Sequence, residues 1–350
     1  MQTPIVMLLA VFMAAAFQTA SDTPRHKVIF DTDFVVPPQD DGLALILALQ
    51  SPELEVLGVT TVAGNRSMED ATADALRALE IAGRTDIPVF KGANMPLVHE
   101  KSDFATTVHG TWWSDDPPRT PPGGFAKKRA ESASAIEFIV RTVMENPGQI
   151  TIAAIGPLTN IATAIRLEPG FAQRVKQLNI MGGAIAILPD GGGNLTPNAE
   201  FNFWVDPEAA KVVLHSGIPV ILSPLNVTRK TRFTKEWYDM IVSVDTPITR
   251  LLKERMGPRF AENPSRGGAM HDQVAVASIF DLTLFQSEEM YVDVDTNHGI
   301  NYGVSVGGRR LWPGAEGARK IRVLFDIDWE RFINMFVRRL TSPVPTQGRS

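Results

Sequence analysis

The fold class follows from KVIFDTDFVVPPQDDGLALILALQ, residues 27–50. Its first five residues form a short apolar run that ends in Asp31, which predicts a buried β-strand. Asp41 then opens an apolar run over residues 42–50, which predicts a helix whose first N–H groups a carboxylate can cap. A strand that passes directly into a helix is the unit from which helix-covered sheets are built.

The same alternation of strand and helix continues along the chain. Strands are predicted at residues 54–62, 87–90, 150–155, 178–181 and 219–223, and helices at 68–82, 132–145, from 158, at 207–216, within 245–278 and at 328–340. We therefore expect an α/β fold: a single domain with a mostly parallel central sheet flanked by helices. In such sheets the functional residues lie in loops beyond the carboxyl ends of the strands.

Two segments interrupt this alternation and are predicted to be loops. Residues 99–129 are rich in Pro, Gly, Trp and charge, and residues 191–197 are rich in Gly. Loops as long as the first are often functional lids. On it, Trp112 and Trp113 either stack on a flat ligand or cover the core beneath the loop.

The N-terminus has the pattern of an export signal. Residues 5–17 form an almost unbroken apolar run, shorter than the roughly 20 residues of a membrane-spanning helix. Small residues at 14–16 and at 20 offer cleavage sites. We expect a signal peptide over residues 1–24 that is removed, and a periplasmic or secreted mature protein free of the membrane. An uncleaved anchor or a wrongly assigned start is the alternative, because no Lys or Arg precedes the apolar run.

Charge and composition narrow the class of partner. The net charge of −5 gives no general basic field, so we expect a small-molecule substrate and no nucleic acid. The chain has no cysteine, which excludes disulfides, thiolate metal sites and a cysteine nucleophile.

An acidic cluster carries the clearest chemical signal. Asp31, Asp33, Asp40 and Asp41 fall within one strand-to-helix turn. Four carboxylates brought together would repel one another without a cation, so the cluster predicts a metal site. Oxygen ligands in a chain without cysteine favour Ca²⁺ or Mg²⁺ over zinc. One helix-capping carboxylate among solvated neighbours is the alternative.

A histidine and an aspartate far along the chain add to this pattern. His271 and Asp272 begin a further apolar helical stretch. From the residues alone, Asp272 is either a helix cap or another acid of the metal site.

Taken together, the motifs resemble the inosine-uridine preferring nucleoside hydrolases. The matching motifs are DTDFVVPPQDD, TTVAGN ending at Asn65, VHG with His109, AAIGPLTNIA with Ile155, MGGA at 181–184, GNLTPNAEFNFWVDPEAA from Gly193, LNVT from Leu225, HDQVAVA from His271 and RVLFDIDWERF at 322–332. The resemblance runs from about residue 27 to 340. It implies a nucleoside hydrolase-like catalytic domain with a Rossmann-like core over residues 25–345, and a homo-oligomer, either a dimer or a tetramer.

The resemblance also implies the reaction and its cofactor: calcium-dependent hydrolysis of the N-glycosidic bond of ribonucleosides to ribose and free base. Asp33 would bind Ca²⁺ and act as general base on a water that the ion holds. Asp41, Asp272 and the backbone carbonyl of Ile155 would complete the metal ligands. Asp31 would be structural.

The substrate contacts implied by the resemblance surround the ribose and the base. Ribose hydroxyls would be held by Asp40, Asn65, Asn194, Glu200 and Asn202. His271 would face the leaving base, and His109 would lie on the loop above it.

These residue types suit the chemistry. Breaking a C1′–N bond builds oxocarbenium character on the ribose, which nearby carboxylates and amides stabilise. Ca²⁺ acidifies water less than Zn²⁺ does, so a carboxylate base is still needed. Attack from the face opposite the base would invert the anomeric carbon. The departing nitrogen needs a proton, for which His271 is the natural source.

Three positions depart from the family pattern. Residues 34–39, with Pro37-Pro38, fill a turn that is commonly shorter and holds Pro-Gly, and a longer turn can re-aim Asp40 and Asp41 or widen the pocket. Gln273 stands in place of the usual proline after His-Asp, and Asn226 stands where Asp is frequent.

Other hypotheses remain open at this point. An exported nucleoside- or sugar-binding protein would keep the ribose-binding residues but need no general base. A metal-dependent hydrolase of a different N-riboside could use the same scaffold. The FDTD motif also resembles the opening of haloacid-dehalogenase phosphatases, but that family does not account for AEFN or for His271-Asp272.

Overall fold

A computed structural model describes residues 25–99 and 116–343. Within these ranges one nine-stranded sheet has the order β3-β2-β1-β4-β5-β6-β9-β7-β8. The strands are β1 (His26–Thr32), β2 (Leu54–Thr61), β3 (Val89–Lys91), β4 (Ile150–Ala154), β5 (Gln177–Met181), β6 (Val220–Ser223), β7 (Phe285–Val294), β8 (Ser305–Gly308) and β9 (Arg319–Ile327). All pairings from β3 to β9 are parallel, and only those of β7 are antiparallel. The predicted mostly parallel sheet is confirmed.

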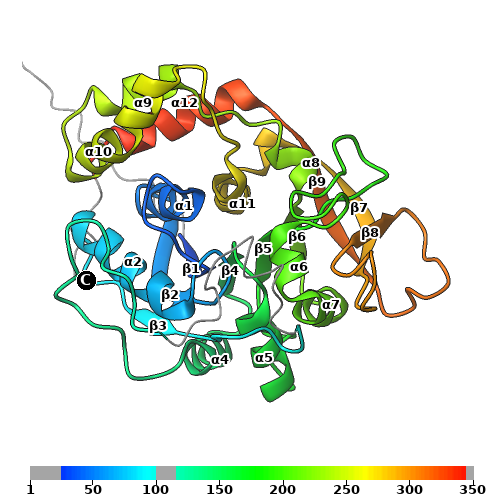
Figure 1. Cartoon of the computed structure of the whole chain (residues 1–350). Coiled ribbons are helices and arrows are strands. Elements are labelled where there is room, and N and C mark those ends of the chain that lie inside the picture. The colour runs from blue at the N-terminus through cyan, green and yellow to red at the C-terminus, as the bar shows by residue number, and fades with distance from the viewer. Residues whose placement is uncertain (1–24, 100–115, 344–350) are drawn as a thin grey trace, which may run out of the picture.

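Helices cover both faces of this sheet (Figure 1). They are α1 (Asp40–Leu49), α2 (Met68–Ile81), α4 (Ala135–Glu145), α5 (Thr159–Leu167), α6 (Phe201–Val205), α7 (Pro207–His215), α8 (Leu225–Thr228), α9 (Lys235–Val242), α10 (Pro247–Glu262), α11 (His271–Phe280) and α12 (Trp329–Leu340), with a 3₁₀ turn at Leu282–Leu284. In the part of the chain that is described, no helix has both the length and the apolar character required to cross a bilayer.

Alternation along the strands creates two hydrophobic cores. Val28 and Phe30 of β1 pack with α1, α11 and α12, whereas Ile29 packs with α4, α5 and α7 on the other face. Because both faces of β1 are buried, its middle residues Val28, Ile29 and Phe30 are all apolar rather than alternating, as expected for a central parallel strand.

The helical pattern predicted over residues 245–278 is interrupted in the structure. α10 ends at Glu262, and a loop that contains Pro264, Gly267 and Gly268 leads to α11. Proline removes a helix hydrogen bond and glycine loses the most backbone freedom in a helix, so their concentration here favours a break. α10 itself nevertheless continues through Gly257 and Pro258. α11 itself is buried from Asp272 to Ile279, which places it against β4, β5 and β6 beside α1.

The antiparallel edge of the sheet is not predicted from the sequence. β7 begins with the partly exposed residues FQSEE, whose pattern gives no clear strand signal, and only its second half is buried. β7 pairs with β9 and β8 and lies far from the acidic turn in the strand order, so it does not alter the predicted position of the site.

Candidate active site

The carboxyl ends of the central strands bring the predicted residues together. Asp33 follows β1, Asn65 follows β2 and Ile155 follows β4. β1 lies between β2 and β4 with parallel register on both sides, so these three loops leave the sheet at the same edge. The Ile155 N–H donates to the Asp31 carbonyl at 2.9 Å, which extends the hydrogen bonding between β1 and β4 by one residue toward the site.

Two helix N-termini complete the acidic cluster. α1 begins with Asp40 and Asp41, and α11 begins with His271 and Asp272. One ligand oxygen from each of Asp40, Asp41 and Asp272 lies within 4.8 Å of the others. Residues more than 230 positions apart thus form one group that can hold a metal ion.

The Asp33 carboxylate is held between backbone segments. Its Oδ2 accepts a hydrogen bond from the Asn65 N–H at 2.6 Å. A Cβ at Gly64 would lie 2.3 Å from Oδ2, and one at Gly156 would lie 2.9 Å from Oδ1, so only glycine permits this close approach. Asp33 is fully buried, and its Oδ1 has no hydrogen-bond partner in the described structure. An orphaned buried carboxylate oxygen fits a cation ligand.

Asp41 is fixed by two neighbours. Its Oδ1 accepts from the Thr32 hydroxyl at 2.7 Å, and its Oδ2 accepts from the Asn65 side-chain amide at 3.1 Å. Asn65 therefore contacts both Asp33 and Asp41, through its backbone and its side chain respectively.

Burial and mutual repulsion keep the cluster short of full ionisation when no cation is present. Burial raises the pKa of Asp33 to about 7. Burial, and then the neighbouring carboxylates, raise the pKa values of Asp41 and Asp272 well above the usual range. A divalent cation would reverse this effect, since it offsets both the repulsion and the cost of burial. The donor set is all oxygen, which suits Ca²⁺ or Mg²⁺.

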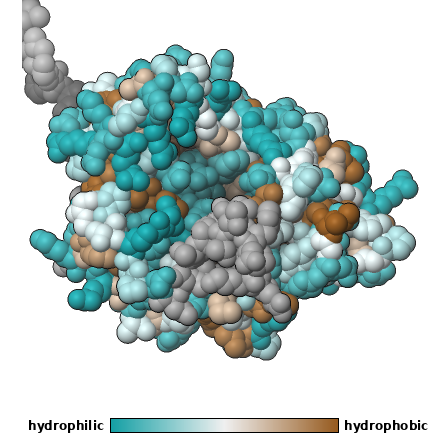
Figure 2. Space-filling view, viewed as in Figure 1, coloured by the Kyte–Doolittle hydropathy of each residue, from teal (hydrophilic) through white to brown (hydrophobic). Residues whose placement is uncertain are grey.

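A cavity of 250 Å³ opens onto the cluster. Its wall contains the predicted residues Asp40, Asn65, Ile155, Asn194, Glu200, Asn202, His271 and Asp272, together with Met181, Leu195 and Phe201. Asp33 and Asp41 lie buried beneath it through their bonds to Asn65. The face shown in Figure 2 is hollowed near its centre, and mostly hydrophilic residues surround the hollow.

The ribose-binding residues predicted on the AEFN motif already make structural contacts. The Glu200 carboxylate caps α6 by accepting from the N–H groups of Asn202 and Phe203 at 2.9 and 3.1 Å, and it accepts from the Gly183 N–H at 2.8 Å. The Asn202 amide donates to the carbonyls of Ile155 and Met181 at 3.2 and 3.1 Å. The carbonyl predicted as a metal ligand therefore also lies beside the ribose pocket.

His271 lies between this cavity and a second one. Its Nδ1 is 2.7 Å from the Thr228 hydroxyl, and burial lowers its pKa, so the ring is neutral near pH 7. The second cavity, of 360 Å³, shares Asp40 and His271 with the first and is also walled by Phe233 and Phe260. Apolar walls next to a polar ribose site suit a flat nucleobase.

The long turn does not displace the two aspartates from the cluster. Phe34, Val35 and Val36 are buried, so the inserted residues enter the core instead of looping outward. A Cβ at Gly42 would lie 2.4 Å from Pro37, which shows how closely the turn packs on α1. Pro38 and Gln39 line the second cavity, so the turn forms part of its wall.

Comparison with known proteins decides the family. A model of the family described as inosine-uridine preferring nucleoside hydrolase matches residues 28–334. The chain belongs to this family.

Relatives and solved structures agree with this assignment. A pyrimidine-specific ribonucleoside hydrolase, RihB, from Escherichia coli is 33% identical over 312 residues, which cover 87% of this chain and 94% of that protein. A plant nucleoside hydrolase, PpNRh1, superposes with a TM-score of 0.76 at 31% identity, covering 91% of this chain and all of that one. A purine-preferring ribonucleoside hydrolase from Gardnerella vaginalis superposes with a TM-score of 0.72 at 28% identity, covering 90% of this chain and 98% of that one. The protein is a ribonucleoside N-glycosyl hydrolase.

Several residues that hold this nucleoside hydrolase site together are not identified by the sequence analysis. Asn160 donates to the Asp31 Oδ1 at 2.9 Å and to the Thr61 carbonyl at 3.0 Å, and it accepts from the Ala93 N–H at 2.8 Å. Asn160 thus links Asp31 to the chain at Thr61 and Ala93, and the structural or supporting role implied for Asp31 stays a prediction. Asn160 lies in the quoted AAIGPLTNIA motif, but a polar residue in a mostly apolar motif does not reveal its partner.

His109, Trp112 and Trp113 lie outside the residues that the structure describes. The place of His109 above the base therefore stays a prediction, and for Trp112 and Trp113 both alternatives, stacking on a base or covering the core, stay open.

Asp206 supports the nucleoside hydrolase fold beside the site. Its buried carboxylate accepts from the Leu97 N–H, the Thr159 hydroxyl and the Ala209 N–H at 2.9, 2.7 and 3.0 Å. We expect Asp206→Ala to lower the free energy of unfolding by about 2–4 kcal/mol, because three buried donors lose their acceptor. Urea unfolding followed by circular dichroism measures this, and a midpoint equal to that of the wild type would contradict it.

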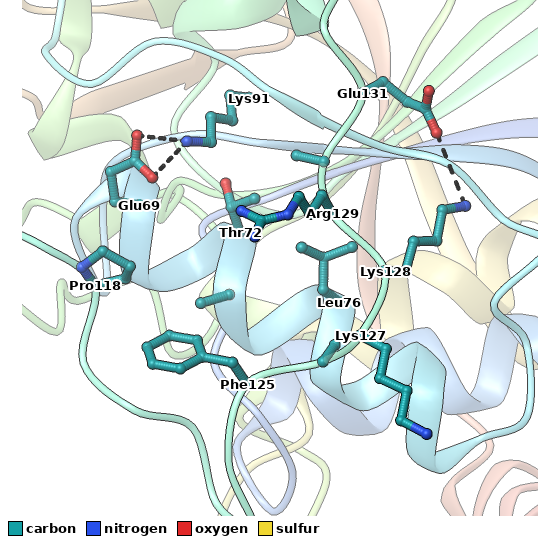
Figure 3. A pocket seen from close by; sticks show the side chains of 13 residues that line it. Glu69, Thr72, Leu76, Lys91, Pro118, Phe125, Lys127, Lys128, Arg129 and Glu131 are labelled. Atoms are coloured by element: carbon teal, nitrogen blue, oxygen red, sulfur yellow. Dashed lines mark hydrogen bonds and ion pairs between the residues drawn. The ribbon is translucent and has the colours of Figure 1, made fainter.

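A larger cavity, of 650 Å³, lies elsewhere, against one face of α2 (Figure 3). The acids in its wall are paired with lysines: Glu69 with Lys91 at 2.7 Å and Glu131 with Lys128 at 3.9 Å. It shares no wall residue with the acidic site and has no unpaired carboxylate cluster, so we do not assign the reaction to it.

Proposed function

We propose that this enzyme needs Ca²⁺ to release ribose and free base from ribonucleosides, and that Asp33 is its general base. The observation that carries the proposal is the unpartnered Oδ1 of the buried Asp33, next to a group of three further carboxylates. Neither helix capping nor packing accounts for three buried acids, Asp33, Asp41 and Asp272, beside the partly buried Asp40.

The proposed metal ligands are Asp33, Asp41, Asp272 and the carbonyl of Ile155. When bound, Ca²⁺ supplies positive charge that keeps the carboxylates ionised and provides further coordination positions for oxygen ligands. The donor set favours a hard cation, since the described site has only oxygen atoms at the point of convergence.

Asp33 would take a proton from the attacking water. A carboxylate that the cation keeps ionised and that is held within reach of the water meets the geometric requirement for a general base. The Asn65 N–H donates to Oδ2, whereas Oδ1 has no hydrogen-bond partner in the described structure, so its lone pairs are open to the cation and to the water.

The ribose would lie in the 250 Å³ cavity between carboxylates and amides. Asp40, Asn65, Asn194, Glu200 and Asn202 line it and would hydrogen-bond the sugar hydroxyls. Their negative charge and dipoles would stabilise the positive charge that develops on the ribose ring.

The base would leave into the 360 Å³ cavity beside His271. When the Thr228 hydroxyl donates to Nδ1, the ring proton sits on Nε2, from which it can reach the departing nitrogen. The neutral ring favoured by burial would stabilise the departing nitrogen by donating a hydrogen bond from Nε2. Full proton transfer would require the imidazolium, whose charge the neighbouring Asp40 favours.

The test is release of ribose from a panel of nucleosides. Residues 25–350 would be incubated with inosine, uridine, adenosine and cytidine, with and without calcium, and ribose measured as reducing sugar. Calcium-dependent release is expected and would rank the bases, on which the relatives differ. Calcium binding with no release from any nucleoside would favour a nucleoside-binding protein or a hydrolase of another N-riboside.

Asn202→Ala is expected to raise KM roughly tenfold with a smaller effect on kcat, because one hydrogen bond to the bound sugar is lost. The matched control is Asn179→Ala, since Asn179 is a buried asparagine of β5 whose amide donates to Ser278 and not to the pocket. Steady-state kinetics separate the two constants. A fall in kcat alone would assign Asn202 to the chemical step.

Export and assembly belong to the same proposal. The apolar run at residues 5–17 supports a signal peptide over 1–24 and a periplasmic or secreted enzyme, with a catalytic domain over 25–345. Detection of the full-length, uncleaved chain in the cytosolic fraction would contradict export. A dimer or tetramer is expected, and light scattering of the purified enzyme would measure it.

A further inference from the structure

Gln273 joins the two helices that carry the acidic cluster. It is the third residue of α11, directly after His271 and Asp272, and only 1% of it is exposed. Its Nε2 donates to the backbone carbonyl of Asp40, in the first turn of α1, at 3.1 Å. Among the hydrogen bonds of the described residues, this is the one that links α1 to α11.

The other end of the Gln273 side chain has no partner. Its Oε1 is buried and accepts no hydrogen bond. An unsatisfied buried acceptor destabilises a fold, and an apolar side chain of the same size would avoid that cost. Packing alone therefore does not explain a glutamine at this position, and its useful group is the amide donor.

The start of α1 is held toward β1 and β2, because Asp41 accepts hydrogen bonds from Thr32 and Asn65. Toward α11, the bond from Gln273 is the one hydrogen bond that the described residues provide. Gln39, at the N-cap of α1, makes no side-chain capping bond, and the same is true of Met270 at the N-cap of α11. A proline in place of Gln273, as is usual after His-Asp, would have no side-chain donor.

We propose that Gln273 is a positioning residue, which holds the first turn of α1 against the first turn of α11 so that their carboxylates converge on one cation. The inference rests on the metal requirement of the proposed function. Loss of the link would let the first turns of α1 and α11 separate, so that Asp272 shifts relative to Asp41, which Thr32 and Asn65 hold in place. A site whose ligands are not held together binds its ion less tightly.

Two substitutions separate positioning from packing. Gln273→Met keeps the size of the side chain and removes both the donor and the unpaired acceptor. Gln273→Asn keeps the amide but is one methylene too short to reach Asp40. We expect each to weaken calcium binding about 10- to 100-fold, as supporting hydrogen bonds of metal sites do. Gln273→Met should show this loss while its calcium-free melting temperature stays equal to or above that of the wild type.

Gln50 provides a matched control within the same helix. It follows the last turn of α1, its Nε2 donates to the Ser342 carbonyl at 2.6 Å, and its Oε1 is buried without a partner. Gln50→Met removes the same kind of bond from the far end of α1, about 15 Å from the first turn. It should leave calcium affinity unchanged.

The experiment is isothermal titration of each purified protein with CaCl₂, followed by kcat and KM for the best nucleoside. If the wild type binds no calcium, the proposed metal requirement fails first. If the wild type binds calcium and the folded Gln273→Met and Gln273→Asn variants bind it equally well, the positioning role is overturned. If only Gln273→Asn is weakened, the side chain acts by packing, which also overturns it. If Gln273→Met does not fold, Gln273→Asn alone decides: calcium affinity equal to that of the wild type would then overturn the positioning role.

Discussion

Replacing Asp33 with alanine is expected to lower kcat about 10³-fold or more, because one substitution removes both the proposed general base and a metal ligand. The protein should stay folded, since the carboxylate is buried with one oxygen unpaired and adds little to the stability of the calcium-free chain. Ribose release at saturating nucleoside and calcium measures the effect.

Asp31 provides the control for Asp33. It is also a buried aspartate at the end of β1 with one unpaired oxygen, Oδ2, but its Oδ1 accepts two hydrogen bonds, from Thr60 and Asn160. Asp31→Asn should therefore change stability more than turnover. Turnover by Asp33→Ala at the wild-type rate would rule out the proposed mechanism, even if Ca²⁺ still binds.

Removing calcium is expected to abolish turnover and to lower the melting temperature. Calcium at a free concentration of about 100 times its Kd stabilises the native state by roughly 2.7 kcal/mol. For a chain of this size, that raises the melting temperature by several degrees. Differential scanning calorimetry with EGTA, and then with excess CaCl₂, measures the loss and its recovery. A melting temperature that does not respond to EGTA would count against the site.

The pKa of Asp33 sets the direction of the pH dependence of calcium binding. Burial raises this pKa to about 7 in the metal-free site, so the carboxyl takes up a proton as the pH falls below 7. A bound ion must displace that proton, and calcium affinity should therefore weaken from pH 8 to pH 6. Calcium binding should also release more protons from the protein at pH 6 than at pH 8, which calcium titrations at the two pH values would measure.

The sequence predicts the parallel sheet and its site edge because the strands are short, apolar and followed by polar residues. Asp33, Asn65 and Ile155 each come directly after a predicted strand, so the rule for parallel sheets places them together. The pairing of α1 with α11 could not be predicted this way. Nothing local to Asp272 says that it meets Asp40 and Asp41, and only the resemblance to a family suggested it.

Contacts that cross the fold were also beyond sequence reasoning. Asn160 and Thr228 each stand among other polar residues in the sequence, and their partners, Asp31 and His271, are set by tertiary packing. Gln273 appeared only as a departure from a motif, and its bond to Asp40 depends on how two helices meet.

The position of β1 in the middle of the sheet has a consequence for how this enzyme can evolve. β1 is paired on both sides and buried on both faces, so the backbone that carries Asp33 opens only when the whole domain unfolds. The second cavity, by contrast, is walled in part by the exposed residues 266–268 and by the turn that contains Pro38. Substitutions there can change which base is accepted without disturbing the proton-transfer apparatus, so new specificities can arise while bond cleavage itself is conserved.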